Sequence, residues 1–305
     1  MTQQFSLSPT DYASRAISPL LEMGAYEAIW LDEKSTFKTV ADKFRENIGA
    51  VPSDFVMAER ALECATRVTA IFRSNGIEKF GVRVHGAGEY PMKLRDARHP
   101  VELLYYQGWW DLVDSPSVAV VGTRKPSADG AKRAERLARL LVEDGYTVVS
   151  GLAAGIDSIA HQTAISSKGR TIAVIGTPLS AVYPKTNADL QKFIADNFLV
   201  VSQVPCLRYM QAKNPTANSY FFPERNKTMS ALTLATIVVE AGETSGTLYQ
   251  ARAALDQGRK LFILDSCFTK GLAWPAKFEA LGGIRVKDYS DIRKHLDVPC
   301  TSDSL

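Results

Sequence analysis

From residue 117 onward, short apolar runs alternate with helical repeats, and this alternation limits the fold more than any other feature of the chain. The first run, 117–121, is SVAVV, as expected of a strand covered on both faces. Further strands are predicted at 147–150, 171–175, 198–202, 236–240 and 260–264. Helices are predicted near 131–141, 157–167, 187–196 and 247–256. This order predicts an α/β fold with a mainly parallel sheet and helices on both faces.

The rest of the chain predicts flanking parts of different character. Residues 1–80 read as a small helical N-terminal domain, with one helix from Ser8-Pro9 to Gly24 and others near 37–47 and 54–75. The expected boundaries are 1–80 for the helical domain, 81–116 for a connector, 117–297 for the sheet domain and 298–305 for a tail. Within the sheet domain, 274–296 predicts a helix, an edge strand and a final helix.

Composition indicates an ordinary folded protein. Of the 305 residues 46% are hydrophobic, and the net charge of +3 permits an acidic partner without demanding one. The cysteines are too far apart in sequence for a zinc knuckle or a redox pair, and they are typical of a reducing compartment: Cys64, Cys206, Cys267 and Cys300. No signal peptide pattern and no apolar run of roughly 18 residues are found, so we expect a cytoplasmic protein that does not enter a membrane.

The loops that follow the strands are the expected binding site, because ligands of open α/β sheets bind beyond the carboxyl ends of the strands. The first loop contains Gly122, Thr123, Arg124, Lys125 and Ser127. It leaves a buried strand and enters a helix, where backbone N–H groups favour an anion. Six basic and two acidic residues lie within 122–139, although a solvated helix face is a common reason for such a pattern.

Three further turns follow the same plan. The loop after the second strand carries Gly151 and Gly155, with Asp157 read as a helix cap. Lys185 precedes a predicted helix, and Ser245-Gly246-Thr247 forms another turn from strand to helix. Each can present N–H groups or a cation to a phosphate.

The stretch 203–227 is predicted to be a long loop, and a loop of this length in a compact domain is usually functional. Its basic residues include Lys213, Arg225 and Lys227, and aromatic side chains are interleaved with them. Basic groups and exposed rings together suit single-stranded nucleic acid. At least one of Phe221 and Phe222 is expected to pack inward instead.

Several enzyme signatures are missing from the sequence. It has no P-loop, no G-x-G-x-x-G after the first strand, no H-E-x-x-H, no nucleophile elbow and no paired metal ligands. We therefore expect no catalytic activity, no metal and no cofactor. The residues alone predict a binder of phosphate or nucleic acid.

Segments at these strand ends resemble the DNA processing protein A (DprA/Smf) family. They are VAVVGTRKPS at 118–127, SGLAAGID at 150–157, TIAVIG at 171–176, YPK at 183–185, FPERN at 222–226, and VVEA at 238–241 leading to SGT at 245–247. Such a series of motifs in this order is highly specific, and the resemblance extends from about 90 to 290. The chain looks like a divergent member that lacks the C-terminal winged helix.

The resemblance implies an extended Rossmann-like domain that forms a homodimer and binds single-stranded DNA without sequence preference. It also implies help in loading the RecA recombinase, as in natural transformation, and no established catalytic activity. The family's DNA-binding positions would fall on Arg124 and Lys185, and on residues around Lys213 and Arg225, including Asn226 and Lys227.

Two alternatives belong to other classes. One is a nucleotide sensor or nucleoside-monophosphate-cleaving enzyme of the LOG group, but Gln250 occupies the position where those enzymes carry a glutamate. The other is a purely structural interaction protein, which the concentration of basic and Gly-rich turns at one sheet edge disfavours.

Overall fold

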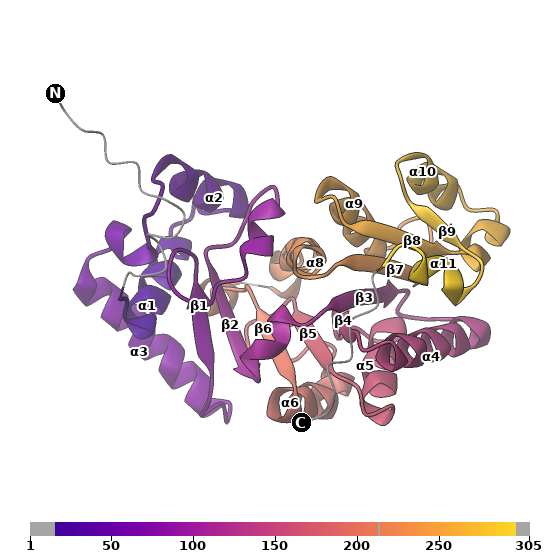
Figure 1. Cartoon of the computed structure of the whole chain (residues 1–305). Coiled ribbons are helices and arrows are strands. Elements are labelled where there is room, and N and C mark those ends of the chain that lie inside the picture. The colour runs from indigo at the N-terminus through magenta and orange to yellow at the C-terminus, as the bar shows by residue number, and fades with distance from the viewer. Residues whose placement is uncertain (1–15, 213, 297–305) are drawn as a thin grey trace.

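A nine-stranded sheet organises the molecule (Figure 1). The computed structural model describes residues 16–212 and 214–296. The strand order is β1-β2-β6-β5-β4-β3-β7-β8-β9. From β6 to β9 all neighbouring pairs are parallel, whereas β1 and β2 join antiparallel at one edge. The prediction of a mainly parallel sheet with helices on both faces is confirmed.

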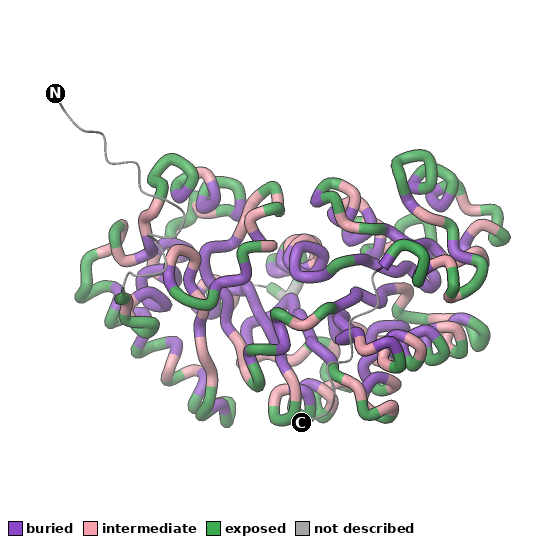
Figure 2. Tube along the Cα trace, viewed as in Figure 1, coloured by how far each residue is buried: buried purple, intermediate pink, exposed green. Residues whose placement is uncertain are grey.

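The central strands are the apolar runs predicted from the sequence. They are β3 (Ser117–Gly122), β4 (Thr147–Ser150), β5 (Thr171–Ile175), β6 (Leu199–Ser202), β7 (Ala235–Glu240) and β8 (Lys260–Leu264). Every residue of β4, β5, β6 and β7 is buried, which explains why these runs show no alternation of apolar and polar residues. Figure 2 shows the buried strands enclosed by helices whose outer faces are exposed.

Helices cover both faces of this sheet (Figure 1). One face carries α4 (Ala128–Glu143), α5 (Ile156–Ser166) and α6 (Ala188–Asn197). The opposite face carries α8 (Phe221–Leu232), α9 (Thr247–Asp256) and α10 (Trp274–Ala280). The predicted C-terminal sequence of helix, strand and helix is confirmed by α10, β9 (Ile284–Val286) and α11 (Tyr289–Arg293). No described helix combines the length and apolar character that crossing a bilayer requires.

The predicted long loop is replaced in large part by helix. Within 203–227 the chain forms α7 (Cys206–Met210), a short 3-10 turn and the first half of α8. Phe221 is fully buried, which confirms that one of the two phenylalanines packs inward. Seven of the twelve residues of α8 are buried, including polar ones, and this removes the amphipathic pattern that would identify a helix.

The N-terminal region contains α1 (Pro19–Trp30), α2 (Phe37–Glu46) and α3 (Ala58–Ser74). The predicted start at Ser8-Pro9 lies outside the described residues. The described helix α1 begins with the same Ser-Pro pair ten residues later, because Ser18 caps it and Pro19 is its first residue. The prediction that Gly24 ends the helix is wrong. Gly24 lies in mid-helix, where a Cβ would collide with the Ala61 carbonyl of α3, so it permits close helix packing.

The connector segment supplies two strands to the sheet. β1 (Gly81–Val84) pairs with β2 (Leu103–Gly108), and β2 pairs antiparallel with β6. Of the aromatic residues in and just after β2, Tyr105 and Trp110 are buried, whereas Trp109 is exposed. One continuous apolar core therefore extends from the N-terminal helices to the sheet.

A buried carboxylate ties the N-terminal helices to the sheet. Glu27 of α1 is fully buried and accepts hydrogen bonds from the Tyr105 hydroxyl and from the backbone N–H groups of Cys206 (2.7 Å) and Leu207 (2.8 Å). The two N–H groups open α7 and would otherwise lack partners. Burial raises the pKa of Glu27 to about 7, although these hydrogen bonds oppose the shift.

We predict that Glu27→Gln flattens the pH dependence of stability. Between the ordinary pKa of 4.5 and the folded value of about 7, the folded chain holds a proton that the unfolded chain has released. The free energy of unfolding should therefore fall as the pH rises through this window, by up to about 3 kcal/mol. Urea unfolding of both proteins at pH 5 and pH 8 measures the difference. Equal pH dependence in the two proteins would contradict the assignment.

Candidate nucleic-acid interface

The direction of strand addition reverses at β3, and a cavity lies at this point. From β3 the chain adds β4, β5 and β6 on one side, and β7, β8 and β9 on the other. Such a switch point leaves a crevice beyond the strand ends. The switch-point cavity has a volume of about 510 Å³. Its lining comes from the loops after β3, β4 and β7, from α8 and from the start of α9.

The loop after β3 contains two kinds of residues. Ser127 is used structurally, because its hydroxyl accepts the Gly130 N–H of α4 at 3.0 Å and donates to Glu240 at 2.8 Å. Gly122, Thr123 and Arg124 line the cavity, and Thr123 N–H donates to the Glu240 carbonyl at 2.7 Å. Arg124 and Lys125 are exposed.

The acids near the loop after β7 are compensated. Glu240 lies 2.8 Å from the Lys270 amine, and partial burial works against its ionisation, but the bonds from Lys270 and Ser127 outweigh burial and lower its pKa. Glu243 accepts the Ala273 N–H. Neither carboxylate lines the cavity, so these two acids do not face an anion bound there.

Arg124 and Lys185 lie on one rim. The Arg124 guanidinium lies over the Tyr183 ring, 5.7 Å from its centroid, and Tyr183 contacts the Phe222 ring at 5.3 Å. Lys185 follows Tyr183 by two residues and is exposed. Asn187 fixes this segment by donating to the Leu152 carbonyl at 2.9 Å. We call Arg124, Tyr183 and Lys185 the cationic rim.

Arg225 lies at the cavity but is buried. Its Nη1 donates to the carbonyls of Gly151 (2.5 Å) and Val174 (2.6 Å), and its Nε donates to Asn226 at 2.9 Å. Burial lowers its pKa to about 10, with Asp157 opposing the shift, so the group stays charged at neutral pH. Arg225 therefore joins the ends of β4 and β5 to α8 while adding positive charge to the cavity.

Asp157 balances this charge and shapes the second loop. Its carboxylate accepts the N–H groups of Gly151 (3.2 Å) and Ala153 (3.4 Å), which belong to the loop before the helix. The prediction that Asp157 caps the helix is wrong, because Gly155 is the N-cap of α5 and Asp157 lies inside the helix. Burial raises its pKa, and Arg225 opposes that shift. Gly155 has a φ of 79°, and a Cβ there would lie 2.5 Å from the Thr123 carbonyl oxygen. Only glycine lets the second loop pack directly on the first.

The loop after β7 is joined to α8 through the side-chain amide of Asn226. Asn226 donates to the Gly246 carbonyl at 3.2 Å, and Ser245 Oγ accepts the Thr247 N–H at 3.2 Å. Ser245, Gly246 and Thr247 all line the cavity. Gln250 is fully buried, with its amide 3.0 Å from the Thr236 hydroxyl. At this position, where the LOG group has a glutamate, this chain therefore has a buried, hydrogen-bonded amide in the lining of the cavity.

One residue of the sequence-predicted site, Lys227, is not brought to the cavity. It pairs with Glu224 of the same helix at 2.5 Å. Lys213 lies outside the described residues, so its prediction is not tested. The remaining residues gather at the cavity or beside it, and Gly151 lies against the Arg225 guanidinium.

Exposed rings near the cavity are functional candidates that the sequence did not single out. Tyr249 is 59% exposed and lines the cavity, and Tyr183 is 48% exposed. In the sequence, Tyr249 is marked only by its position in the first turn of the helix after Gly246. Within the described ranges 16–212 and 214–296, no cluster of three His, Cys, Asp or Glu residues could hold a metal ion.

Comparisons with known proteins identify the family and the fold. The model of the family described as DNA recombination-mediator protein A matches residues 81–278. The DNA processing protein DprA of Streptococcus pneumoniae is 40% identical over 184 residues, which are 60% of this chain and 62% of the relative, so the match spans less than two thirds of that relative's length.

Two solved structures have the same fold. DNA processing protein A from Streptococcus pneumoniae superposes with a TM-score of 0.66 at 28% identity, covering 93% of this chain and 99% of the other. DNA processing protein A from Helicobacter pylori, whose structure describes a single-stranded DNA binding mode, superposes with a TM-score of 0.61 at 26% identity, covering 71% of this chain and 95% of the other.

We predict that Arg225→Met lowers the free energy of unfolding by about 3 kcal/mol, because two buried carbonyls lose their donor and Asp157 loses its compensating charge. Denaturant unfolding measures the loss. Arg139→Met, at an exposed position of α4, is the control and should change stability by less than about 0.5 kcal/mol. Equal stability of the two variants would show that Arg225 does not fix the strand ends.

Proposed function

Because the chain belongs to the DNA recombination-mediator protein A family, we propose that it binds single-stranded DNA along the cationic rim and the switch-point cavity. The solved structure of DNA processing protein A from Helicobacter pylori, which has the same fold, concerns a binding mode for single-stranded DNA. The proposal concerns binding of the strand and assigns no reaction to it.

The single observation that carries this proposal is the placement of the Arg124 guanidinium over the Tyr183 ring beside Lys185. Arg124 comes from a loop far away in sequence and contacts the exposed Tyr183 ring, and Lys185 follows that ring by two residues. Cations neutralise backbone phosphates, and exposed rings accept unpaired bases whatever their identity. A double helix would present phosphates but no free base faces to these rings.

Absence of sequence preference follows from which groups remain free. Asn226 is the cavity residue best suited to read a base edge, but its amide already accepts from Arg225 and donates to Gly246. Guanidinium, amine, ring and backbone N–H groups then remain for the ligand. These groups hold a phosphate or stack on any base.

We further propose that the protein acts as a homodimer and helps to load a RecA recombinase onto the bound strand, as the family resemblance implies. Light scattering measures the dimer. Recombinase loading is measured by RecA-dependent ATP hydrolysis on DNA coated with single-strand-binding protein. A monomer at micromolar concentration, or no acceleration of loading, would refute the corresponding part.

We predict that Arg124→Ala with Lys185→Ala weakens binding to oligothymidylate about tenfold or more at moderate salt. The slope of log affinity against log salt should become shallower by about 1.4, since each phosphate contact on single strands contributes about 0.7. Fluorescence anisotropy at several salt concentrations measures both quantities, and mixed-sequence oligonucleotides should lose affinity equally.

The matched control is Arg73→Ala with Lys192→Ala, which removes two exposed cations that do not line the cavity. Its affinity and salt slope should equal those of the wild type. An unchanged slope in the Arg124 and Lys185 variant would place the DNA elsewhere on the molecule.

We also predict that Tyr249→Ser weakens oligothymidylate binding about 5-fold or more without changing the salt slope. A stacked base contributes about 1–3 kcal/mol and carries no charge of its own. Tyr249→Phe keeps the ring and should keep the affinity. Equal loss in both variants would mean that the hydroxyl, and not stacking, matters.

A further inference from the structure

Glu240, the last residue of β7, contacts the loop that carries Arg124 and Lys125. It is buried, and it pairs in the sheet with Gly122, where the register between β3 and β7 shifts. Its backbone carbonyl accepts the Thr123 N–H at 2.7 Å. The pairing of β7 with β3 is thereby extended into the first residue of the loop.

The Glu240 carboxylate holds the other end of the same loop. Its Oε2 accepts the Ser127 hydroxyl at 2.8 Å, and its Oε1 accepts the Ser127 N–H at 3.3 Å. A Cβ on Gly130, in the first turn of α4, would lie 2.0 Å from Oε2, so glycine leaves the space that the carboxylate occupies. The two cations of the loop therefore lie between two points that are both bound to one residue.

Two cations pair with this carboxylate. Lys270, the last residue of the 3-10 turn Asp265–Lys270, lies 2.8 Å from Oε1, and Arg133 of α4 lies 3.7 Å from Oε2. Partial burial alone would raise the pKa of Glu240, but the bonds from Lys270 and Ser127 outweigh burial and lower the pKa. The start of α4, where backbone N–H groups favour an anion, therefore already has an anion supplied by the chain itself.

We propose that Glu240 is a positioning residue for the bound strand, because it holds the loop after β3 in the shape that brings Arg124 to a phosphate. This inference rests on the DNA site proposed above. Simple electrostatics predicts the opposite effect, since an acid beside a DNA site repels the phosphates. A cation on a loop that is already fixed loses less entropy when it binds, and this gain favours binding.

Glu240→Gln distinguishes the two effects, because they change oligothymidylate binding in opposite directions. Ser127, Lys270 and Arg133 all present donors to the carboxylate, so the new amide nitrogen faces a donor in either orientation and the loop is released. We expect affinity at least threefold weaker and a salt slope shallower by up to about 0.7, the share of one phosphate contact. Unchanged or tighter binding would overturn the proposal.

Glu243→Gln is the matched control, because it removes the same charge from the same loop. Glu243 is exposed and accepts the Ala273 N–H, and among the described residues it has no bond to the loop after β3. The glutamine oxygen can keep the bond to Ala273. Affinity for oligothymidylate should stay at the wild-type value or rise. An equal loss in the Glu240 and Glu243 variants would overturn the proposal.

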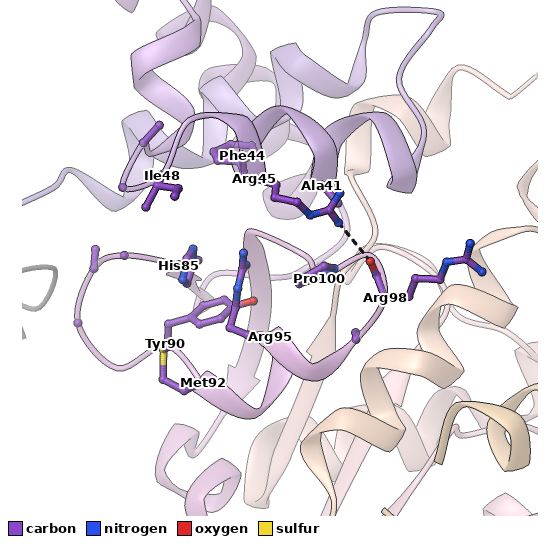
Figure 3. Close-up of a pocket in the computed structure, with 16 residues that line it drawn as sticks. Ala41, Phe44, Arg45, Ile48, His85, Tyr90, Met92, Arg95, Arg98 and Pro100 are labelled. Carbon is purple, nitrogen blue, oxygen red and sulfur yellow. Dashed lines mark hydrogen bonds between the residues drawn. The ribbon is translucent and has the colours of Figure 1, made fainter. Parts of the chain in front are cut away.

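A second control tests whether cations released from an acid change binding by themselves. Asp42 of α2 pairs with Lys38 (2.6 Å) and with Arg45, which lines a separate cavity of about 700 Å³ between α2 and the segment 85–100 (Figure 3). None of the residues lining that cavity lines the switch-point cavity. Asp42→Asn should therefore keep the wild-type affinity and salt slope. A loss equal to that of Glu240→Gln would contradict positioning.

A double-mutant cycle shows whether Glu240 acts through Arg124. Residues that act through one another have non-additive effects on binding, whereas independent effects add. Glu240→Gln should therefore weaken binding by less than twofold when Arg124→Ala is already present. A full loss in both backgrounds would mean that the substitution damages the site in general, and it would overturn the proposal.

Hydrogen exchange of the free protein separates failure of this inference from failure of the proposed DNA site. Glu240→Gln should speed amide exchange in the segment 122–130 about fivefold or more and leave the segment 156–166 of α5 unchanged. Unchanged exchange in 122–130 would refute positioning wherever the DNA binds. Faster exchange, combined with wild-type affinity of Arg124→Ala, would instead refute the proposed DNA site and the role of this loop in it.

Discussion

The buried guanidinium of Arg225 is the contact on which the binding edge depends. A buried charge is costly unless it is fully hydrogen-bonded and compensated, and Arg225 meets both conditions through the carbonyls of Gly151 and Val174, the amide of Asn226 and the nearby charge of Asp157. These bonds hold the ends of β4 and β5 against α8. The first loop then packs on the second at Gly155, and Tyr183 packs on Phe222 of α8. The cationic rim is thus positioned by a cation that is itself withdrawn from solvent.

The positive character of this edge comes from how charges are paired, and a net charge of only +3 does not reveal it. Glu240 and Glu243 lie at the loop after β7, but neither lines the cavity. Ser127 and Lys270 pair with Glu240, and the Ala273 N–H donates to Glu243. Arg124 and Lys185 keep exposed charges.

Much of the fold could be predicted from sequence, because parallel strands buried on both faces leave continuous apolar runs. The two cations of the rim could be predicted as well, since Arg124 and Lys185 lie in loops that lead from such a strand into the next helix. Other features depend on tertiary contacts that leave no local signal. Helix α8 is buried on most sides and lacks a polar face, so it was expected to be a loop. Gly24 permits close packing of α1 on α3, although the sequence predicts that the helix ends there. Arg225 is buried, which contradicts the general preference of arginine for the surface. The pairing of β2 with β6 joins segments about ninety residues apart.

The central claim is that one edge of the sheet, organised by Arg225, holds an unpaired strand between the β3 and β7 loops. A crystal structure of the chain with oligothymidylate tests it most directly. The account predicts phosphate oxygens within hydrogen-bond distance of Arg124 and Lys185, a base stacked on Tyr183 or Tyr249, and the Arg225 contacts to Gly151 and Val174 unchanged. A strand bound elsewhere, with the cationic rim free, would contradict it.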